Sequence, residues 1–170
     1  MKLTQELLKE LLHYDPDSGV FTWRERGNSA FDKRYAGKEA GTINDRGYRK
    51  VSISGVVYRA HRLAFMYMKG RWPRKEVDHL DHDKLNNRWL NLRDTSHPEN
   101  GRNKSKFKNN TSGINGVNWN SNALNWRAQI MVSGKNKQLG SFDNIEFAQA
   151  ARLEAEREYG YHENHGMVAA

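Results

Sequence analysis

The chain has 170 residues, with 28 Lys and Arg against 20 Asp and Glu, so its formal charge is +8 and its pI is about 9.7. This length suits one ordinary domain or two small ones, and the positive charge favours a polyanionic partner, most commonly nucleic acid. The sequence has no Cys, which excludes disulfide bonds and Cys-ligated zinc, and no apolar run approaches the roughly 20 residues of a membrane span.

Residues 1–75 are predicted to form an N-terminal region of helices and short strands. Four segments carry the pattern: a helix at 4–13, a strand at 20–23, a hairpin at 47–62 and a short buried helix at 62–70. Thr4 can cap the first helix, and Gly70 ends the last one. The Gly- and charge-rich segment after residue 23 gives no firm prediction. The first twelve residues are amphipathic with interleaved acids, unlike a signal peptide, so we expect a cytoplasmic protein.

Residues 76–100 are polar, and their predicted order is strand, loop, strand, helix. The strands are expected at 76–80 and 91–95, and residues 81–89 between them are too polar for a core and are predicted to form a loop. Ser96 or Thr95 can cap the helix that follows.

The side chains of this segment suit metal-dependent hydrolysis. A strand pair packed on the helix can bring Asp78 and Asn100 to one point, and their carboxylate and amide oxygens are hard ligands suited to Mg²⁺ or Mn²⁺. His79 points to the other side of a regular strand, but a twist or bulge can bring it beside the metal. There it can deprotonate a water that attacks phosphorus, while the metal polarises the phosphate and stabilises the leaving oxygen.

The stretch "VDHLDHDKLNNRWLNLRDTSHPEN" at 77–100 resembles an HNH endonuclease motif of the phage and group I intron type. That family commonly shows D-H, then D-x-x-K-x-N-N, then N-L, then E-N, and residues 4–73 also resemble the N-terminal part of such phage proteins. The resemblance implies a ββα-metal fold in which His79 is the general base and Asp78 and Asn100 hold the metal. It makes Asn91 the middle Asn, which hydrogen-bonds backbone across the loop and fixes the hairpin.

Two positions depart from the family pattern. Asn100 stands where the third His of the motif is often found, and an amide there should still bind a hard metal. His82 stands where Gly is common, and a positive φ costs a non-Gly residue some stability, so the loop can differ and His82 could reach the metal or a phosphate. Asp81 and Asp83 are interpreted as loop caps, and His61 as a hydrogen-bonded core residue.

Residues 101–112 change composition and are predicted to be a linker or helix extension. Four of the twelve residues are basic and none is acidic: Arg102, Lys104, Lys106 and Lys108. They can neutralise DNA phosphates, and the alternative is a merely solvated linker.

A second unit is predicted at 109–163, with three short strands and a long helix, followed by a tail at 164–170, and the last ten residues of the chain are expected to be frayed. Its pattern, G-V, then W-x-A-x-I, then L-G-x-F, then A-A, resembles the plant ethylene-response-factor (Apetala-type) DNA-binding domain. By that resemblance a sheet enters the major groove, and its exposed residues meet DNA: Trp119, Arg127, Gln129 and Lys137. Trp119 and Trp126 can equally be part of the core.

The sequence therefore predicts an α+β protein: a ββα-metal HNH core at 76–108 with an N-terminal helix and hairpins, then a small three-stranded sheet with a helix. We expect a metal-dependent endonuclease that nicks one strand of duplex DNA as a monomer. It would act in the bacterial host cytoplasm if phage-encoded, in homing or in phage DNA processing. The alternatives are a non-catalytic DNA-binding regulator with an HNH fold and, less favoured because a basic amphipathic helix is lacking, a membrane-surface protein.

Overall fold

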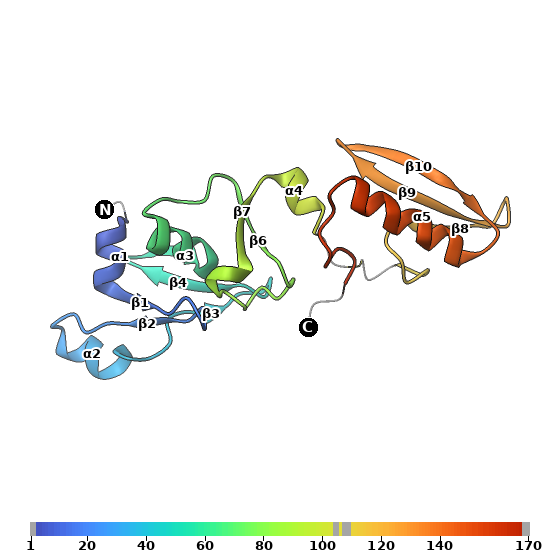
Figure 1. The fold of residues 1–170 in the computed structure, drawn as a ribbon. Helices are drawn as coiled ribbons and strands as arrows, with labels where there is room; N and C mark the ends of the chain where they lie inside the picture. Colours follow the sequence, from blue (N-terminus) through green and yellow to red (C-terminus); the bar gives the residue numbers. More distant parts are fainter. Residues whose placement is uncertain (1–2, 104–105, 107–109, 168–170) are drawn as a thin grey trace. The chain divides into compact units, whose positions relative to one another are not determined.

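The computed structural model describes residues 3–103, 106 and 110–167 (Figure 1). Contacts divide the chain into two compact units, Met1–Thr95 and Ser96–Ala170, and each is described by itself. In the described residues the strands form four small antiparallel sheets, accompanied by separate helices. The predicted α+β class is therefore confirmed. No helix among these residues is long and apolar enough to cross a bilayer.

The first unit begins with helix α1, Gln5–Leu11, whose first turn is capped by Thr4 as predicted, with Leu7 N donating to Thr4 Oγ1 at 3.3 Å. The helix stops earlier than its Leu pattern predicts, because the chain becomes strand β1, Leu12–Tyr14, and pairs with β2, Phe21–Trp23. Tyr14 is buried and stacks on Phe21 with ring centroids 4.6 Å apart. Tertiary packing thus overrides local helix propensity here.

The middle of this unit contains a short helix and a three-stranded sheet. Helix α2, Ser29–Tyr35, and strand β3, Thr42–Ile43, fall in the Gly- and charge-rich segment that carried no firm prediction. Strands β4, Arg49–Ile53, and β5, Val56–Arg59, form the predicted hairpin, and the sheet order is β3-β4-β5. Ser54 and Gly55 form its turn with φ of 49° and 79°, as a tight two-residue hairpin turn requires.

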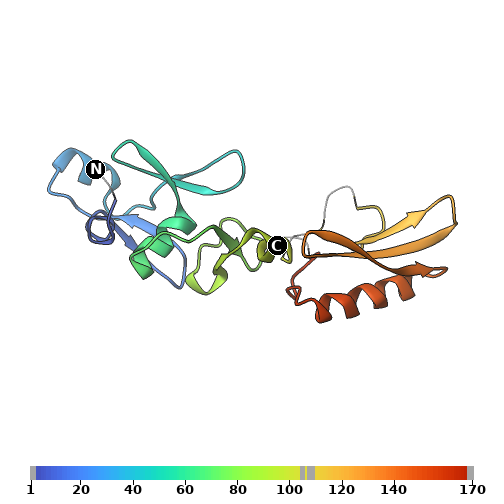
Figure 2. The same ribbon diagram turned by 90° about the horizontal axis from the view of Figure 1, so that it is seen from above.

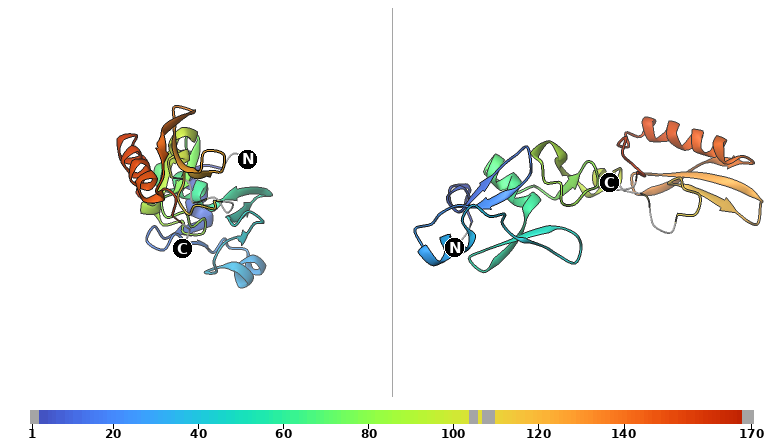
Figure 3. Two further views of the ribbon diagram at one scale, coloured as in Figure 1. Left: turned by 90° about the vertical axis from the view of Figure 1, so that its right-hand side faces the viewer. Right: turned by 90° about the horizontal axis from the view of Figure 1, so that it is seen from below.

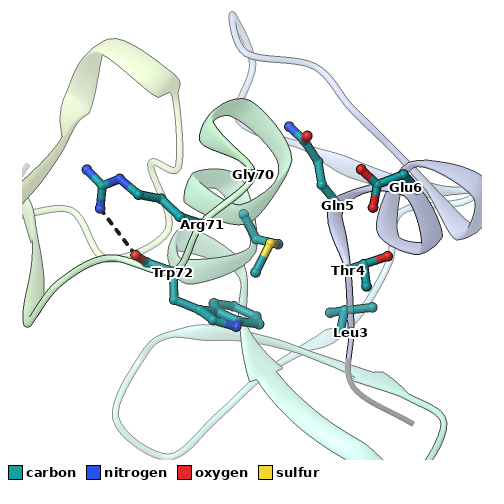
Figure 4. A pocket seen from close by; sticks show the side chains of 8 residues that line it. Leu3, Thr4, Gln5, Glu6, Gly70, Arg71 and Trp72 are labelled. Atoms are coloured by element: carbon teal, nitrogen blue, oxygen red, sulfur yellow. Dashed lines mark hydrogen bonds between the residues drawn. The ribbon is translucent and has the colours of Figure 1, made fainter.

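Helix α3, Ala60–Lys69, is the centre of the first core and ends at Gly70, whose φ of 65° is the left-handed conformation expected of a helix stop. Gln5 Nε2 donates to the Tyr67 carbonyl at 2.7 Å and so ties α1 to α3. Beside this contact, the start of α1 and the residues after α3 line a shallow pocket (Figure 4). The pocket is lined by both polar and apolar side chains, and Arg71 Nη1 there donates to the Trp72 carbonyl at 3.2 Å.

The first unit ends with β6, Glu76–His79, a single 3₁₀ turn η1, Trp89–Asn91, and β7, Leu92–Thr95. The two strands are antiparallel, with Asp78 opposite Arg93 and His79 opposite Leu92. The β1–β2 turn packs on the loop between them, because Tyr14 Oη donates to the Asn87 carbonyl at 2.7 Å and Trp89 N donates to the Pro16 carbonyl at 2.9 Å. The N-terminal elements and this hairpin therefore share one core.

The second unit begins with helix α4, His97–Gly101, where Ser96 is the N-cap and both its backbone N and its Oγ donate to Glu99. The predicted three strands are β8, Val117–Asn120, β9, Asn125–Val132, and β10, Lys135–Phe142, in the order β10-β9-β8. Helix α5, Ile145–Glu158, runs along one face of this sheet (Figures 2 and 3) and buries Ala148 and Ala155 against it.

The prediction that the end of the chain is frayed is wrong for residues 161–167. Tyr161 Oη donates to the Met131 carbonyl at 2.7 Å, and His162 N donates to the Arg102 carbonyl at 3.1 Å. Arg152 is only 4% exposed, and its guanidinium contacts Glu156 Oε1 at 2.8 Å and His165 Nε2 at 3.3 Å. A buried charge needs such partners, so the tail packs where it completes them.

Candidate active site

Asp78 and His79 lie next to each other at the end of β6, and both are buried. Asp78 Oδ2 accepts from Arg93 Nη2 across the strand pair at 2.8 Å. A carboxylate carries about four lone-pair sites, so pairing with a guanidinium is compatible with a role as a metal ligand. Arg93 was not singled out from the sequence, although its place opposite Asp78 follows once the hairpin register is known.

The orientation of the His79 ring is set by the loop. Asn87 is 2% exposed, and its Nδ2 donates to the Leu85 carbonyl at 3.0 Å, which turns its Oδ1 towards His79 Nε2 at 3.3 Å. Because an amide oxygen only accepts, Nε2 carries the proton, and Nδ1 is then the basic nitrogen of the neutral ring.

The same surroundings decide the charge of His79. Burial lowers the pKa of its imidazole, and the hydrogen bond with Asn87 and the nearby Asp81, Asp78 and Asp83 charges oppose that shift without cancelling it. The ring is therefore neutral at neutral pH, which is the form that a general base needs.

Two aromatic rings from segments before β6 lie near His79. The His61 ring lies edge-on to it at 5.1 Å between centroids, and the Tyr48 ring lies 6.1 Å from it and 5.2 Å from His61. His61 is 4% exposed, and burial first, then His79, Arg59 and Arg62, lowers its pKa to about 3. The sequence predicted a core histidine at this position, but its contact with His79 depends on how α3 packs against β6.

The loop after β6 is built on Asp81 and Asn91. Asn91 Nδ2 donates to Asp81 Oδ1 and to the Asn86 carbonyl, both at 2.8 Å, and Asn91 Oδ1 accepts from Asp81 N at 3.1 Å. Asn91 thus makes backbone hydrogen bonds at two points of the loop, and its proposed role in catalysis remains a prediction. Burial raises the pKa of Asp81, but hydrogen bonds from Asn91 and Asn86 outweigh it, so the net shift is downward.

The acidic loop residues serve as backbone acceptors. Asp81 Oδ1 accepts from Asp83 N at 2.9 Å, and Asp83 Oδ1 accepts from Leu85 N at 2.9 Å. His82 adopts φ of 66°, the left-handed conformation, and its N donates to the His79 carbonyl at 3.1 Å. A non-Gly residue pays for that conformation, as expected from the departure at this position.

Asn100, the second proposed metal ligand, lies in α4 of the second unit. Its pairing with Asp78 therefore stays a prediction. In the described chain no group of three His, Asp or Glu side chains is arranged to hold a metal. Of the predicted basic run, Arg102 and Lys106 are described, and Lys104 and Lys108 lie outside the described residues.

The second sheet separates the four residues predicted to contact DNA. Arg127 and Gln129 alternate along β9 with the buried Ala128 and Ile130, so they share the face away from α5.

Lys137 pairs with Ile130 in register and therefore lies on the helix side, where its Nζ donates to the Tyr159 hydroxyl at 2.6 Å. Trp119 pairs with Trp126 on that side, at 5.2 Å between rings, and remains 47% exposed. The structure thus brings together Arg127 and Gln129, but neither Trp119 nor Lys137 with them.

Comparison with known proteins agrees with the motif. Residues 58–102 match the HNH endonuclease family. The chain is 36% identical to Protein 3.8 of Escherichia phage T7 over 70 residues, which is 41% of this chain and 58% of that protein. The chain thus spans somewhat over half the length of this relative, and no solved structure matches it. Residues 58–102, which hold the predicted site residues Asp78, His79, Asn91 and Asn100, form an HNH endonuclease-family domain.

Proposed function

We propose that this protein is a metal-dependent endonuclease that hydrolyses phosphodiester bonds in duplex DNA. The observation that carries the proposal is His79, buried and neutral at the end of β6 inside the HNH-family domain, with its Nε2 bound by Asn87. In this arrangement Nδ1 takes the proton from a water that attacks phosphorus. The hydrogen bonds of Asn91 hold the loop that carries Asn87, and so keep the base in its orientation.

Asp78 and Asn100 are the proposed metal ligands. A carboxylate and a carboxamide oxygen fit Mg²⁺ or Mn²⁺ by their chemistry, and Arg93 lies beside Asp78 across the strand pair. When bound, the metal would polarise the phosphate and stabilise the leaving oxygen.

The second unit is proposed to read the DNA. Its sheet face away from α5 presents Arg127 and Gln129, side chains that can hydrogen-bond base edges in the major groove. The order of three strands and a helix agrees with the resemblance to Apetala-type domains, and Arg102 and Lys106 add positive charge before the sheet. Homing and phage DNA processing are both compatible with such a protein.

The proposed reaction cuts one strand per binding event, because the chain has one candidate general base, His79, and one pair of proposed metal ligands. A double-strand break needs a second site, usually supplied by a two-fold dimer. The target site is first identified by selecting cleaved molecules from a library of DNA sequences. Supercoiled plasmid that carries one copy of this site should give open circles before linear DNA when Mg²⁺ or Mn²⁺ is present. With chelator it should give neither product. Immediate linear DNA from a sedimentation-verified monomer would contradict nicking.

The assignment of the base is tested with His79→Ala. Cleavage should fall by at least the roughly 100-fold typical of a lost general base, while DNA affinity stays nearly unchanged, because the ring is not a phosphate contact. His13→Ala, at an exposed histidine of β1, is the matched control and should cleave like the unmodified protein. Asn100→Ala and Asp78→Ala should raise the metal concentration needed for half-maximal cleavage, and unaltered metal titrations would rule out this ligand pair.

One observation favours the second candidate, a DNA-binding regulator that has an HNH fold without cleavage. The Asp78 carboxylate is paired with a guanidinium, and a charged partner of this kind can replace a metal as the group that stabilises a buried carboxylate. If the unmodified protein binds duplex DNA tightly but leaves it intact with either metal, the regulator is the correct assignment.

A further inference from the structure

The exposed face of the β3–β4–β5 sheet carries two cations directly opposite each other. Lys50 on β4 pairs with Arg59 on β5, and both are exposed, whereas Val51 and Ile53 on the other face of β4 are buried in the core. Like charges at directly opposite positions destabilise a strand pair. A local arrangement that costs stability is expected where a function requires it.

A third cation joins this face from the loop after β6. The Lys84 ammonium lies over the Tyr48 ring at 5.0 Å, and the Arg59 guanidinium lies over the same ring at 5.0 Å. Lys84 Nζ also donates to the Arg46 carbonyl at 3.1 Å, so the ammonium is held at the β3–β4 turn. One aromatic ring therefore gathers two positive charges from distant parts of the chain.

In the described parts of the chain, no carboxylate forms an ion pair with this cluster of Lys50, Arg59 and Lys84. Glu39, next to the sheet, is paired with Arg49 at 2.9 Å, and Asp81 and Asp83 accept hydrogen bonds inside their own loop. The cluster is therefore a concentrated and uncompensated patch of positive charge, which suits a polyanion.

The position of the patch indicates which polyanion. Tyr48, under Arg59 and Lys84, has its ring 6.1 Å from that of His79, so the cations lie beside the proposed base. We infer that Lys50, Arg59 and Lys84 form a phosphate clamp, which binds the backbone of duplex DNA next to the bond that is cut. This inference depends on the proposed function for its choice of ligand, and it adds a DNA contact in the first unit, at residues for which the sequence predicted no contact with DNA.

The clamp is tested by DNA binding of the full chain in chelator, which needs no cleavage. The double variant Arg59→Gln and Lys84→Gln should reduce the slope of log affinity against log salt by about 0.9 for each lost phosphate contact and lower affinity on the order of 10- to 100-fold at moderate salt. The control variant Lys33→Gln with Lys38→Gln removes the same charge from exposed lysines outside the cluster. It should reduce the slope of log affinity against log salt less than the Arg59 and Lys84 double variant does. The charge-keeping pair Arg59→Lys and Lys84→Arg should retain the slope.

A second measurement separates binding from folding. Arg59→Gln removes both the like-charge pair with Lys50 and the cation–π contact with Tyr48, which act in opposite directions, so its melting temperature should stay close to that of the unmodified protein while its DNA affinity falls. If the double variant keeps the full salt slope, or loses no more affinity than the Lys33 and Lys38 control, the clamp is wrong. Loss of binding to vesicles of anionic lipid, with DNA binding unaffected, would overturn it too. If the unmodified protein binds DNA but never cuts it, the proposed endonuclease activity is wrong. The salt dependence of DNA affinity in the double variant still tests whether the clamp binds phosphates.

Discussion

At the scale of single residues, burial sets the charge of the two histidines that face each other beside Tyr48. Burial lowers the pKa of His61 from 6.5 to about 3 and also lowers that of His79. Below the ordinary pKa the unfolded chain binds more protons than the folded one, so stability should fall as the pH drops from 6.5 towards 3. His61→Phe should flatten this dependence by up to about 1.4 kcal/mol per pH unit. Melting curves from about pH 7.5 to about pH 4.5 measure it, and parallel curves for both proteins would contradict the burial argument.

At the scale of elements, the β1–β2 turn packs against the loop that orients His79 and supports it. Gly19 has φ of 76°, and a Cβ there would lie 2.3 Å from the Asn87 carbonyl carbon, so Gly19→Ala must displace backbone. We expect a loss of about 2–5 kcal/mol of unfolding free energy from strain and overpacking. Gly55→Ala is the matched control, since its φ is 79° but nothing lies within 4 Å of the new methyl, and it should cost only about 1–2 kcal/mol. Denaturant midpoints compare the two, and equal losses would show that the turn does not press on the loop.

At the scale of the whole molecule, each unit has its own core. Residues such as Leu63 and Phe21 form the first, and Val117, Ala128 and Ala148 form the second. All proposed catalytic residues lie before residue 101, so a chain without 109–170 should still nick DNA slowly, but with weaker and less selective binding. Nicking assays and competition between specific and random duplexes measure both properties. Full affinity and selectivity in the shortened chain would show that the second unit does not read DNA.

Local signals explain the parts of the protein that its sequence determined. The Thr4 cap, the Ser54-Gly55 turn and the Gly70 stop each act through neighbouring backbone, so they hold wherever the segment folds. The strand, loop, strand and helix order of residues 76–100 and the spacing of Asp78, His79 and Asn91 were likewise readable, because the HNH motif is a contiguous stretch.

Only the tertiary structure decided what surrounds these residues. His61, Tyr48 and Arg93 contact His79 or Asp78 through packing and strand register between separate segments, and no short pattern encodes such partners. The face on which Lys137 lies depends on its pairing with Ile130, and the tail packs because buried Arg152 needs partners. The sequence by itself determined the chemistry available at residues 78–100, whereas the long-range contacts determined that His79 is buried, neutral and bound through Nε2, since burial and orientation depend on the residues that surround a side chain in space.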